Sequence, residues 1–373
     1  MIRSRSNRGF TLIEIMVGLV IGLIATVIIF QVFEVAERQK RTTTGTSDAQ
    51  GNGAIAVFMM ERHMKMAGAG LNHDTFEGCT TLHTFDADLG GPIDATGGSS
   101  LFNVAAIGDG ASPSGSDTIT LLYYDDPSNP EFRYSDSLLS ATVNNPSLDL
   151  QPLTAHNCNA GGMALMAQSG TCMLMSVTGV TPSSGTSTPA TVRHDPAPAG
   201  RYNPAAGVSM SWGSYNKYSA RFQCFPGLFR VTYGINTRQL EVTEPDPAVP
   251  GATRTTPVVP DILDLQAQYG IDNPALVPPI EWVDATGATW GAPSLADVRR
   301  IRAVRVAILA LNSEYQKPPT DTGVCDATTD AMRAGWSSWA NLNPPADLTP
   351  DFHCYRFKVF ESVIPLRNIL WAN

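Results

Sequence analysis

The sequence predicts an α+β fold in which one long N-terminal helix packs on an antiparallel β-sheet head with long loops. Two observations carry this prediction. The longest apolar run, Phe10 to Phe33, lies near the N-terminus and contains one ionisable residue, Glu14. From Leu71 onward, short apolar or alternating segments are separated by stretches rich in Gly, Ser and Pro, as in strands joined by turns. With 373 residues the chain can bury a large core.

The apolar run has the flanks and length of a membrane helix. Residues 1–9 contain Arg3, Arg5 and Arg8 and no acid, which favours a cytoplasmic start. As a helix the run is about 36 Å long and can cross a hydrocarbon core of about 30 Å. A cleaved signal peptide would be shorter and end in an A-x-A-like site, which "AERQKRTTTG" lacks. A plain signal anchor explains the length but not Glu14.

The order of features around Glu14 is specific. A basic leader ends in Gly9, Phe10 follows, and "TLIE" puts the acid at the fifth position from Phe10. This order closely resembles the class III signal of type IV pilins and pseudopilins. The resemblance implies that a prepilin peptidase cuts between Gly9 and Phe10, that the new amine of Phe10 is N-methylated, and that the apolar run remains.

The resemblance also implies a role for the Glu14 carboxylate. An acid in the first turn of a helix complements the positive end of the macrodipole. In a filament, Glu14 could also meet the cationic amine of a neighbouring subunit in a medium of low dielectric. We therefore expect Glu14 to act in assembly. Gly18 and Gly22 form a G-x-x-x-G that would allow close helix packing, although Gly is common in membrane spans.

Polar residues after Phe33 still fit a helix, and we expect it to continue through 34–70. "TTTGTSDAQGNG" combines β-branched residues with Gly, so the helix could melt or kink at 42–53. Glycines at 68 and 70 predict its end. Four methionines in the second half could suggest copper, but core and interface filling is favoured: Met59, Met60, Met64 and Met66.

The head, residues 71–373, is predicted to be β-rich. Six segments are predicted strands: Thr118–Tyr124, Met173–Thr178, Leu228–Ile235, Leu265–Gly270, Ile301–Leu311 and Tyr355–Ile364. Three stretches rich in Gly, Ser or Pro are predicted surface loops or insertions: 86–116, 179–204 and 244–260.

Six cysteines follow the apolar run, and none forms a C-x-x-C pair: Cys79, Cys158, Cys172, Cys224, Cys325 and Cys354. An even number after an export-type segment indicates disulfides in an oxidising compartment. We predict that Cys158 pairs with Cys172, which closes the shortest loop. Cys325 then pairs with Cys354, which leaves Cys79 with Cys224. Some free buried thiols are the alternative.

No pattern of residues indicates an enzyme, a cofactor or a metal centre. G-x-S-x-G, H-E-x-x-H, P-loop and G-x-G-x-x-G motifs are absent from the sequence. Calcium sites and polar turns are alternatives for "DADLGGPIDATG", which has Gly97 where the template needs an acid, and for "YDDPSNPE"; turns are favoured. Trp336 and Trp339 could contact a partner subunit or a glycan, with core packing as the alternative. The net charge of −9 argues against nucleic-acid binding.

A finer resemblance covers most of the chain. Four segments resemble the PilW-type minor pilins of Gram-negative type IV pili: "MERHMKMAGAG", "DILDLQAQYGID", "LADVRRIRAVRVAIL" and "FESVIPLRN". This implies a leader at 1–9, a transmembrane and assembly helix at 10–33, its continuation at 34–70, and a periplasmic, later extracellular, head at 71–373.

The resemblance implies a minor pilin that primes assembly and lies at or near the pilus tip. Its implied partners are other minor pilins, the major pilin, a PilY-type tip adhesin, the prepilin peptidase and the inner-membrane assembly platform. The chain would be held in the inner membrane before assembly and lie on the cell surface afterwards, in pili that serve adhesion and twitching motility. The alternatives are a pseudopilin of a type II secretion or DNA-uptake system and, from another class, an anchored envelope enzyme.

Overall fold

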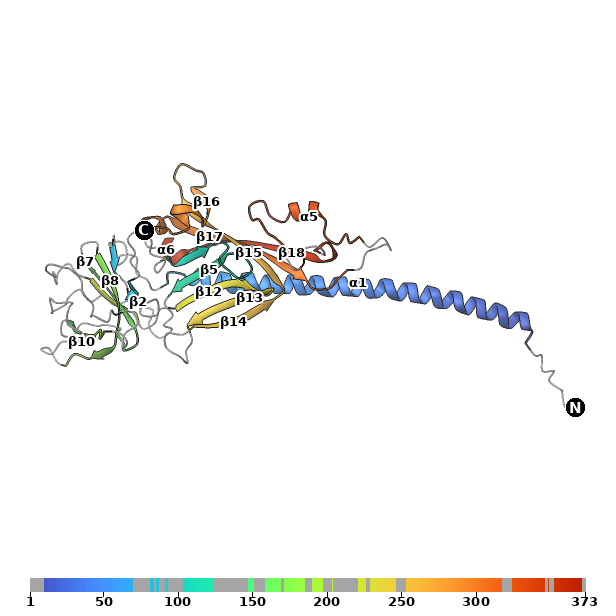
Figure 1. The fold of residues 1–373 in the computed structure, drawn as a ribbon, viewed down its shortest axis with the longest axis horizontal. Helices are drawn as coiled ribbons and strands as arrows, with labels where there is room; N and C mark the ends of the chain where they lie inside the picture. The colour runs from blue at the N-terminus through green and yellow to red at the C-terminus, as the bar shows by residue number, and fades with distance from the viewer. Residues whose placement is uncertain are drawn as a thin grey trace.

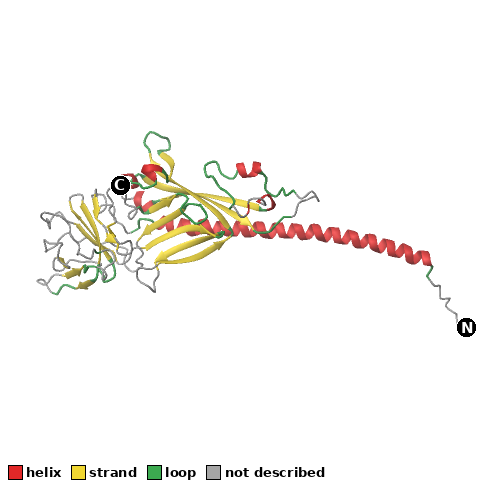
Figure 2. Ribbon diagram, in the orientation of Figure 1, coloured by secondary structure: helices red, strands yellow, loops and turns green. Residues whose placement is uncertain are grey.

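A computed structural model describes residues 10–69, 81–83, 85–86, 91–92, 103–123, 147–150, 158–168, 171–184, 190–196, 203, 221–225, 229–245, 253–316, 324–345, 348 and 352–370. One long helix, α1 (Leu12–Met66), runs from the N-terminal end into the head, where its second half lies against the sheets (Figure 1). The first half of α1 extends away from the head by itself, and the strands gather at the other end of the molecule (Figure 2). The predicted α+β class is confirmed.

The predicted break at 42–53 is wrong, because α1 is continuous through this section. Two threonine hydroxyls donate to carbonyls one turn back, Thr43 to Gln39 (2.9 Å) and Thr46 to Thr42 (2.7 Å). This back-bonding satisfies each hydroxyl within the helix at a small cost in helix stability. Helix packing supplies the remaining stabilisation, since most helical stability in proteins comes from tertiary contacts.

The glycines of this section allow the helix to touch the sheet. A Cβ atom at Gly45 would overlap the side chain of Asn312, and one at Gly53 would overlap the ring of Phe360. By contrast, a Cβ at Gly51 would meet nothing within 4 Å. Two of the glycines that weaken the helix by propensity are therefore needed for its close approach to the head.

Beyond the glycines, α1 buries small and flexible residues. Ala56, Met60, Met64 and Ala67 are fully buried in the head core. This confirms core packing for Met60 and Met64. The helix ends as predicted at the glycine stop: Gly68 has φ +76° and donates its N–H to the carbonyl of Leu122. The side-chain amide of Asn368 caps the last carbonyls of α1 by bonding Lys65 and Ala67.

Two antiparallel sheets share the main core with α1. The first, with strand order β14-β13-β12-β5-β4, contains β4 (Ala105–Gly108), β5 (Thr118–Tyr123), β12 (Phe229–Asn236), β13 (Gln239–Pro245) and β14 (Thr253–Pro260). The second, with order β16-β15-β17-β18, contains β15 (Ile262–Asp272), β16 (Ile280–Asp284), β17 (Ile301–Asn312) and β18 (Arg356–Pro365). Tyr233 and Tyr269, one from each sheet, are the largest side chains fully buried between them and the helix.

A further set of strands forms what we call the distal lobe, which consists of the described residues within 81–92 and 147–225. One sheet, ordered β1-β8-β7-β11, contains β1 (Thr81–His83), β7 (Met163–Gln168), β8 (Thr171–Ser176) and β11 (Arg221–Phe225). A second, ordered β6-β10-β9, contains β6 (Ser147–Leu150), β9 (Gly179–Thr181) and β10 (Ala190–Arg193), and β2 (Phe85–Asp86) pairs with β3 (Gly91–Pro92). The lobe has its own buried core, which includes Met166, Met175 and Phe222.

The distal lobe is inserted into the first sheet. Tyr123, the last residue of β5, pairs directly with Phe229, the first residue of β12. The chain between them contributes six of the lobe's strands. The lobe lies at the end of the molecule opposite the N-terminus, beyond the two sheets of the head (Figure 1).

Short helices complete the head: α3 (Gly287–Trp290), α4 (Leu295–Val298), α5 (Asp330–Ala334), the 3-10 helix η2 (Phe352–Cys354) and α6 (Arg367–Leu370). All six predicted strands are confirmed as β5, β8, β12, β15, β17 and β18, with bounds shifted by at most a few residues. The predicted loop at 244–260 is wrong over Thr253–Pro260, which forms β14. Because β14 is an edge strand, its prolines remove few ladder bonds. The predicted loops at 86–116 and 179–204 likewise contain strands, among them β4 and β10.

Candidate functional site

The start of α1 is closed by a reciprocal pair of side chains. Thr11, the N-cap residue, accepts the backbone N–H of Glu14 at 3.3 Å through its hydroxyl oxygen. The Glu14 carboxylate in turn accepts the backbone N–H of Thr11 at 2.8 Å and its hydroxyl at 2.9 Å. This is a capping box, which satisfies donors that a helix otherwise leaves without partners. The sequence order "TLIE" places both residues at the spacing that a capping box requires.

Among the described residues, the groups that bond the Glu14 carboxylate are neutral. Both groups that bond its carboxylate belong to Thr11, and no basic group pairs with it within residues 10–69. Phe10 is 85% exposed, and Gly9, the other side of the predicted cut, lies outside the described residues. The cap therefore fixes where the carboxylate lies, one turn from the predicted new amine, and leaves its charge to be neutralised by another group.

The first half of α1 is exposed on all sides. Its large apolar side chains from Phe10 to Val35 are half or more exposed, and the helix is long and apolar enough to cross a membrane. A helix that is apolar all round needs an apolar surrounding. A Cβ atom at Gly18 or Gly22 would meet nothing within 4 Å, so both positions are open to close packing on another helix. That packing role stays a prediction.

Two disulfides join described cysteines, and one of them was predicted. Cys325 is bonded to Cys354, as predicted. Cys158 is bonded to Cys224, so the predicted pairs Cys158–Cys172 and Cys79–Cys224 are wrong. The physical reason is strand pairing: β11 lies beside β7 in antiparallel register, which brings Cys224 next to the loop that leads into β7. Cys172 on β8 is also disulfide-bonded. Cys79 lies outside the described residues.

The Cys325–Cys354 disulfide closes a loop that covers the outer face of the second sheet. Trp336 lies on Phe357 of β18 with ring centroids 5.0 Å apart, and Arg305 of β17 lies over the ring of Trp339 at 4.3 Å. The backbone N–H of Asn343 donates to the buried carboxylate of Asp264 at 2.8 Å. Both tryptophans therefore pack on their own sheet, which is the core-packing alternative, and the loop is held at several points.

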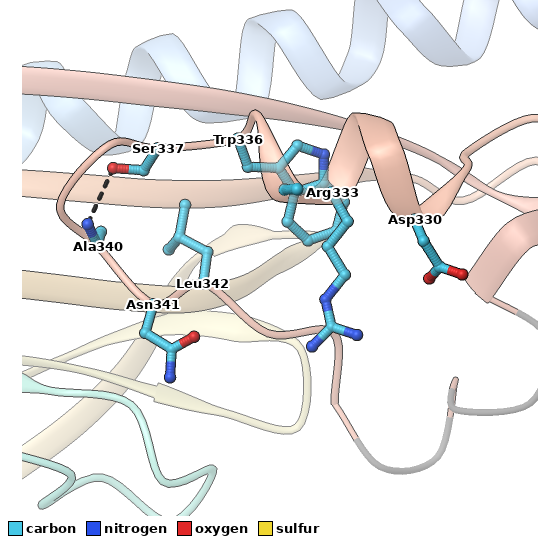
Figure 3. Close-up of a pocket in the computed structure, with 8 residues that line it drawn as sticks. Asp330, Arg333, Trp336, Ser337, Ala340, Asn341 and Leu342 are labelled. Atoms are coloured by element: carbon cyan, nitrogen blue, oxygen red, sulfur yellow. Dashed lines mark hydrogen bonds between the residues drawn. The ribbon is translucent and has the colours of Figure 1, made fainter.

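This loop also forms a pocket of about 380 Å³. It is lined by Asp330, Arg333, Ala334, Trp336, Ser337, Ala340, Asn341 and Leu342. Figure 3 shows these side chains around the hollow, with the N–H of Ala340 bonded to the hydroxyl of Ser337 at 2.9 Å. Charged and amide groups and apolar side chains contribute to the pocket walls in similar measure. Trp336 is thus both packed and in part accessible, whereas Trp339 is held by Arg305.

A buried carboxylate links the two sheets of the head. Asp117 is 3% exposed and accepts backbone N–H groups from Gly110 at 3.0 Å and from Ala267 of β15 at 2.7 Å. Burial is the main cause that raises the pKa of Asp117 to about 6, and the nearby carboxylates of Asp109 and Asp264 raise it further. The two backbone N–H groups act in the opposite direction. The network was not predicted, because nothing in the sequence indicates that Asp117 faces β15.

We expect the folding stability of the chain to depend on pH through Asp117. Because its folded pKa of about 6 exceeds the ordinary aspartate pKa of 3.8, the contribution is full below about pH 4 and is lost as pH rises through 6. The expected change is on the order of 2 kcal/mol. Unfolding free energies of the detergent-solubilised chain, measured from pH 4 to 7, should fall less, or rise more, with increasing pH for Asp117→Asn than for wild type.

The control for this slope is Asp109→Asn, which removes a neighbouring charge but keeps the buried carboxyl and should keep the dependence. His194 contributes with the opposite sign, because burial lowers its pKa. The difference between variants, rather than the absolute slope, therefore isolates Asp117. Equal slopes for wild type and Asp117→Asn would contradict the assignment.

No group of three or more His, Cys, Asp or Glu residues that could hold a metal occurs among the described residues. The predicted calcium alternatives fall mainly on residues outside them: Asp88, Asp94, Asp125, Asp126 and Glu131. Asp86 is described as the end of β2.

Comparisons with known proteins match two parts of the chain. Residues 4–30 match the family model described as the prokaryotic N-terminal methylation motif, which contains Gly9, Phe10 and Glu14. Residues 232–368 match the family model PilW, type IV pilus-assembly protein W, from β12 to α6. No curated protein and no solved structure matches the chain. The methylation motif lies at the start of the long helix and the PilW match spans the second sheet, and together these two matches support a PilW-type minor pilin of type IV pili.

Proposed function

We propose that the chain primes assembly of a Gram-negative type IV pilus and takes a place at or near the tip. The distal lobe is the observation that carries the placement. It adds bulk at the end of the head opposite the membrane helix, outside both matched segments (Figure 1). A subunit with extra bulk at that end fits best where no further subunit has to stack above it.

The proposed partners follow from this placement. Other minor pilins and the major pilin would pack along α1, a PilY-type adhesin would meet the head, and the prepilin peptidase and inner-membrane assembly platform would act before incorporation. The head would lie in the periplasm before assembly and at the cell surface afterwards. The role is structural rather than catalytic, and it needs neither a cofactor nor nucleic acid.

The site residues have proposed roles that one measurement can check. Gly9 and Phe10 flank the cut, and Phe10 carries the methyl group. Mass spectrometry of the N-terminal peptide from filaments should find N-methylated phenylalanine at position 10. For the head, Trp336 at the pocket is the better partner contact, because Trp339 is packed against Arg305.

Tip placement predicts a labelling pattern. An epitope inserted between Thr237 and Arg238, in the exposed turn of the β12–β13 hairpin, should be reached by gold-labelled antibody at one end of each pilus. Labelling spread along the shaft would contradict the placement. Loss of the chain should reduce the number of pili at least tenfold while the level of major pilin in the membrane stays unchanged.

The alternative is a pseudopilin of a type II secretion or DNA-uptake system, which shares the same motif at 4–30. It predicts the reverse outcome of the deletion: pili remain, and secretion or DNA uptake is lost. The PilW match favours the pilus.

A further inference from the structure

The distal lobe buries a histidine whose ring has no hydrogen-bond partner among the described residues. His194 directly follows β10 and is 2% exposed, and neither of its ring nitrogens bonds another described group. Side chains alternate between two faces along an extended chain, so His194 points to the same side as Val192, which belongs to the lobe core. A buried charge without partners costs far more free energy than a buried neutral group, so this environment favours the neutral imidazole.

The backbone on both sides of His194 is held in place. The carbonyl of Arg193 accepts the N–H of Thr178 at 2.8 Å, and the N–H of Asp195 donates to the Thr178 hydroxyl at 2.9 Å. The side-chain amide of Asn203 donates to the carbonyl of Asp195 at 2.7 Å. The imidazole therefore cannot turn out into water unless these bonds break.

The charged groups nearest to His194 along the chain pair with each other. Arg193 donates to one carboxylate oxygen of Asp195 at 2.6 Å, and the Thr178 hydroxyl donates to the other at 2.5 Å. These bonds lower the pKa of Asp195 to about 2, so Asp195 stays ionised in weak acid. Burial lowers the pKa of His194, and the charge of Asp195 acts in the opposite direction. The other ionisable residues of the described lobe strands are His83, Asp86, Asp149 and Arg221.

His194 lies where the two main sheets of the lobe are joined. Asn203, which bonds Asp195 just after β10, also exchanges two hydrogen bonds with the backbone of Ser176 at the end of β8, at 2.9 and 3.0 Å. Residues of both sheets share the lobe core. The lobe leaves and re-enters the head at the paired residues Tyr123 and Phe229, so its sheets can separate while the first sheet of the head keeps its pairing.

We propose that protonation of His194 opens the distal lobe while the two sheets packed on α1 stay closed. The protonated ring has two N–H donors and a positive charge, and no described group is placed to accept either donor. A histidine whose folded pKa lies below its unfolded value of about 6.5 contributes stability above that pH and loses it as the pH falls. Asp117 has the opposite dependence, so weak acid loosens the lobe without loosening the rest of the head. Opening exposes a methionine-rich core at the end of the molecule opposite the N-terminus (Figure 1).

The test compares two pairs of methionines in the detergent-solubilised full-length chain. Met166 and Met175 are fully buried in the lobe core, and Met60 and Met64 are fully buried where α1 meets its two sheets. The chain receives a fixed dose of hydrogen peroxide at about pH 7.5 and at about pH 5, on either side of the ordinary histidine pKa of about 6.5. Mass spectrometry then measures the sulfoxide at each methionine. We expect oxidation of the lobe pair to rise at least fivefold in acid and that of the α1 pair to change less than twofold. No rise in the lobe pair, or an equal rise in both pairs, would overturn the proposal.

Substitutions assign the effect to one ring. His194→Leu removes the titrating group, and because the ring has no described hydrogen-bond partner to lose, both lobe methionines should stay protected at both pH values. His194→Phe keeps a flat ring and repeats the test if leucine packs poorly. His83→Asn changes another histidine of the lobe, on β1, and should keep the rise in acid. A rise that persists in the His194 variants, or fast oxidation of both variants already at neutral pH, would contradict a switch based on charge.

Discussion

Glu14→Ala should still be cut and held in the membrane but should be absent from filaments. A carboxylate in a membrane helix is costly to leave uncompensated, and the described groups that bond Glu14, both on Thr11, are neutral. The amine that cleavage creates at Phe10 of a neighbouring subunit would supply that compensation. An immunoblot of the sheared filament fraction, beside one of the membrane fraction, measures the outcome. Normal incorporation of Glu14→Ala would refute the assembly role.

The capping box requires a control, because Glu14→Ala removes a helix cap as well as a charge. Thr11→Val removes the hydroxyl that Glu14 bonds and keeps the carboxylate. Loss of one cap costs about 1 kcal/mol, which a long helix in a membrane can tolerate. We expect Thr11→Val to enter filaments. Glu14→Gln keeps an acceptor for Thr11 without the charge and should fail like Glu14→Ala.

Gly53→Ala should destabilise the head, even though alanine favours a helix. The new Cβ would overlap the ring of Phe360 and push α1 away from β18. Overpacking of this kind typically costs about 1–3 kcal/mol. The matched control is Gly51→Ala, two residues earlier on the same helix, where the Cβ meets nothing within 4 Å. That change should be neutral or stabilise by up to about 1 kcal/mol.

The measurement is the thermal unfolding of both variants in detergent, with cleavage at position 53 by limited proteolysis as a second readout. Phe360→Ala combined with Gly53→Ala should recover part of the loss, because it removes the atoms that the new Cβ meets. Equal stability of the Gly51 and Gly53 variants would show that the helix can move without cost.

The parts of the fold set by local pattern were predictable. The apolar run, its "TLIE" start and the glycine stop predicted both ends of α1, and alternation predicted six strands. The errors have one cause, which is long-range packing. Gly45 and Gly53 weaken a helix by propensity, but contacts with Asn312 and Phe360 override this. Cys158 and Cys224 meet only because β7 and β11 pair, a register that spacing along the chain cannot give.

In the candidate site, too, the features set by local sequence were predictable and those set by long-range packing were not. Glu14 and Thr11 lie three residues apart, so their partnership is local and could be predicted from the motif. Asp117 and His194 owe their character to their surroundings: one is buried by β15, and the other is buried in the distal lobe. Neither degree of burial follows from residue type, since a carboxylate is usually outside and a histidine is only sometimes fully buried.

The insertion of the distal lobe has a consequence for how the chain folds. β5 and β12 must pair across the whole inserted segment, and the entropy cost of closing such a loop grows with its length. The Cys158–Cys224 bond shortens that segment to less than half, which lowers the cost by roughly 0.8 kcal/mol. Formation of this disulfide in the lobe therefore helps to close a sheet that contains neither cysteine, so oxidation of the lobe contributes to the folding of the head.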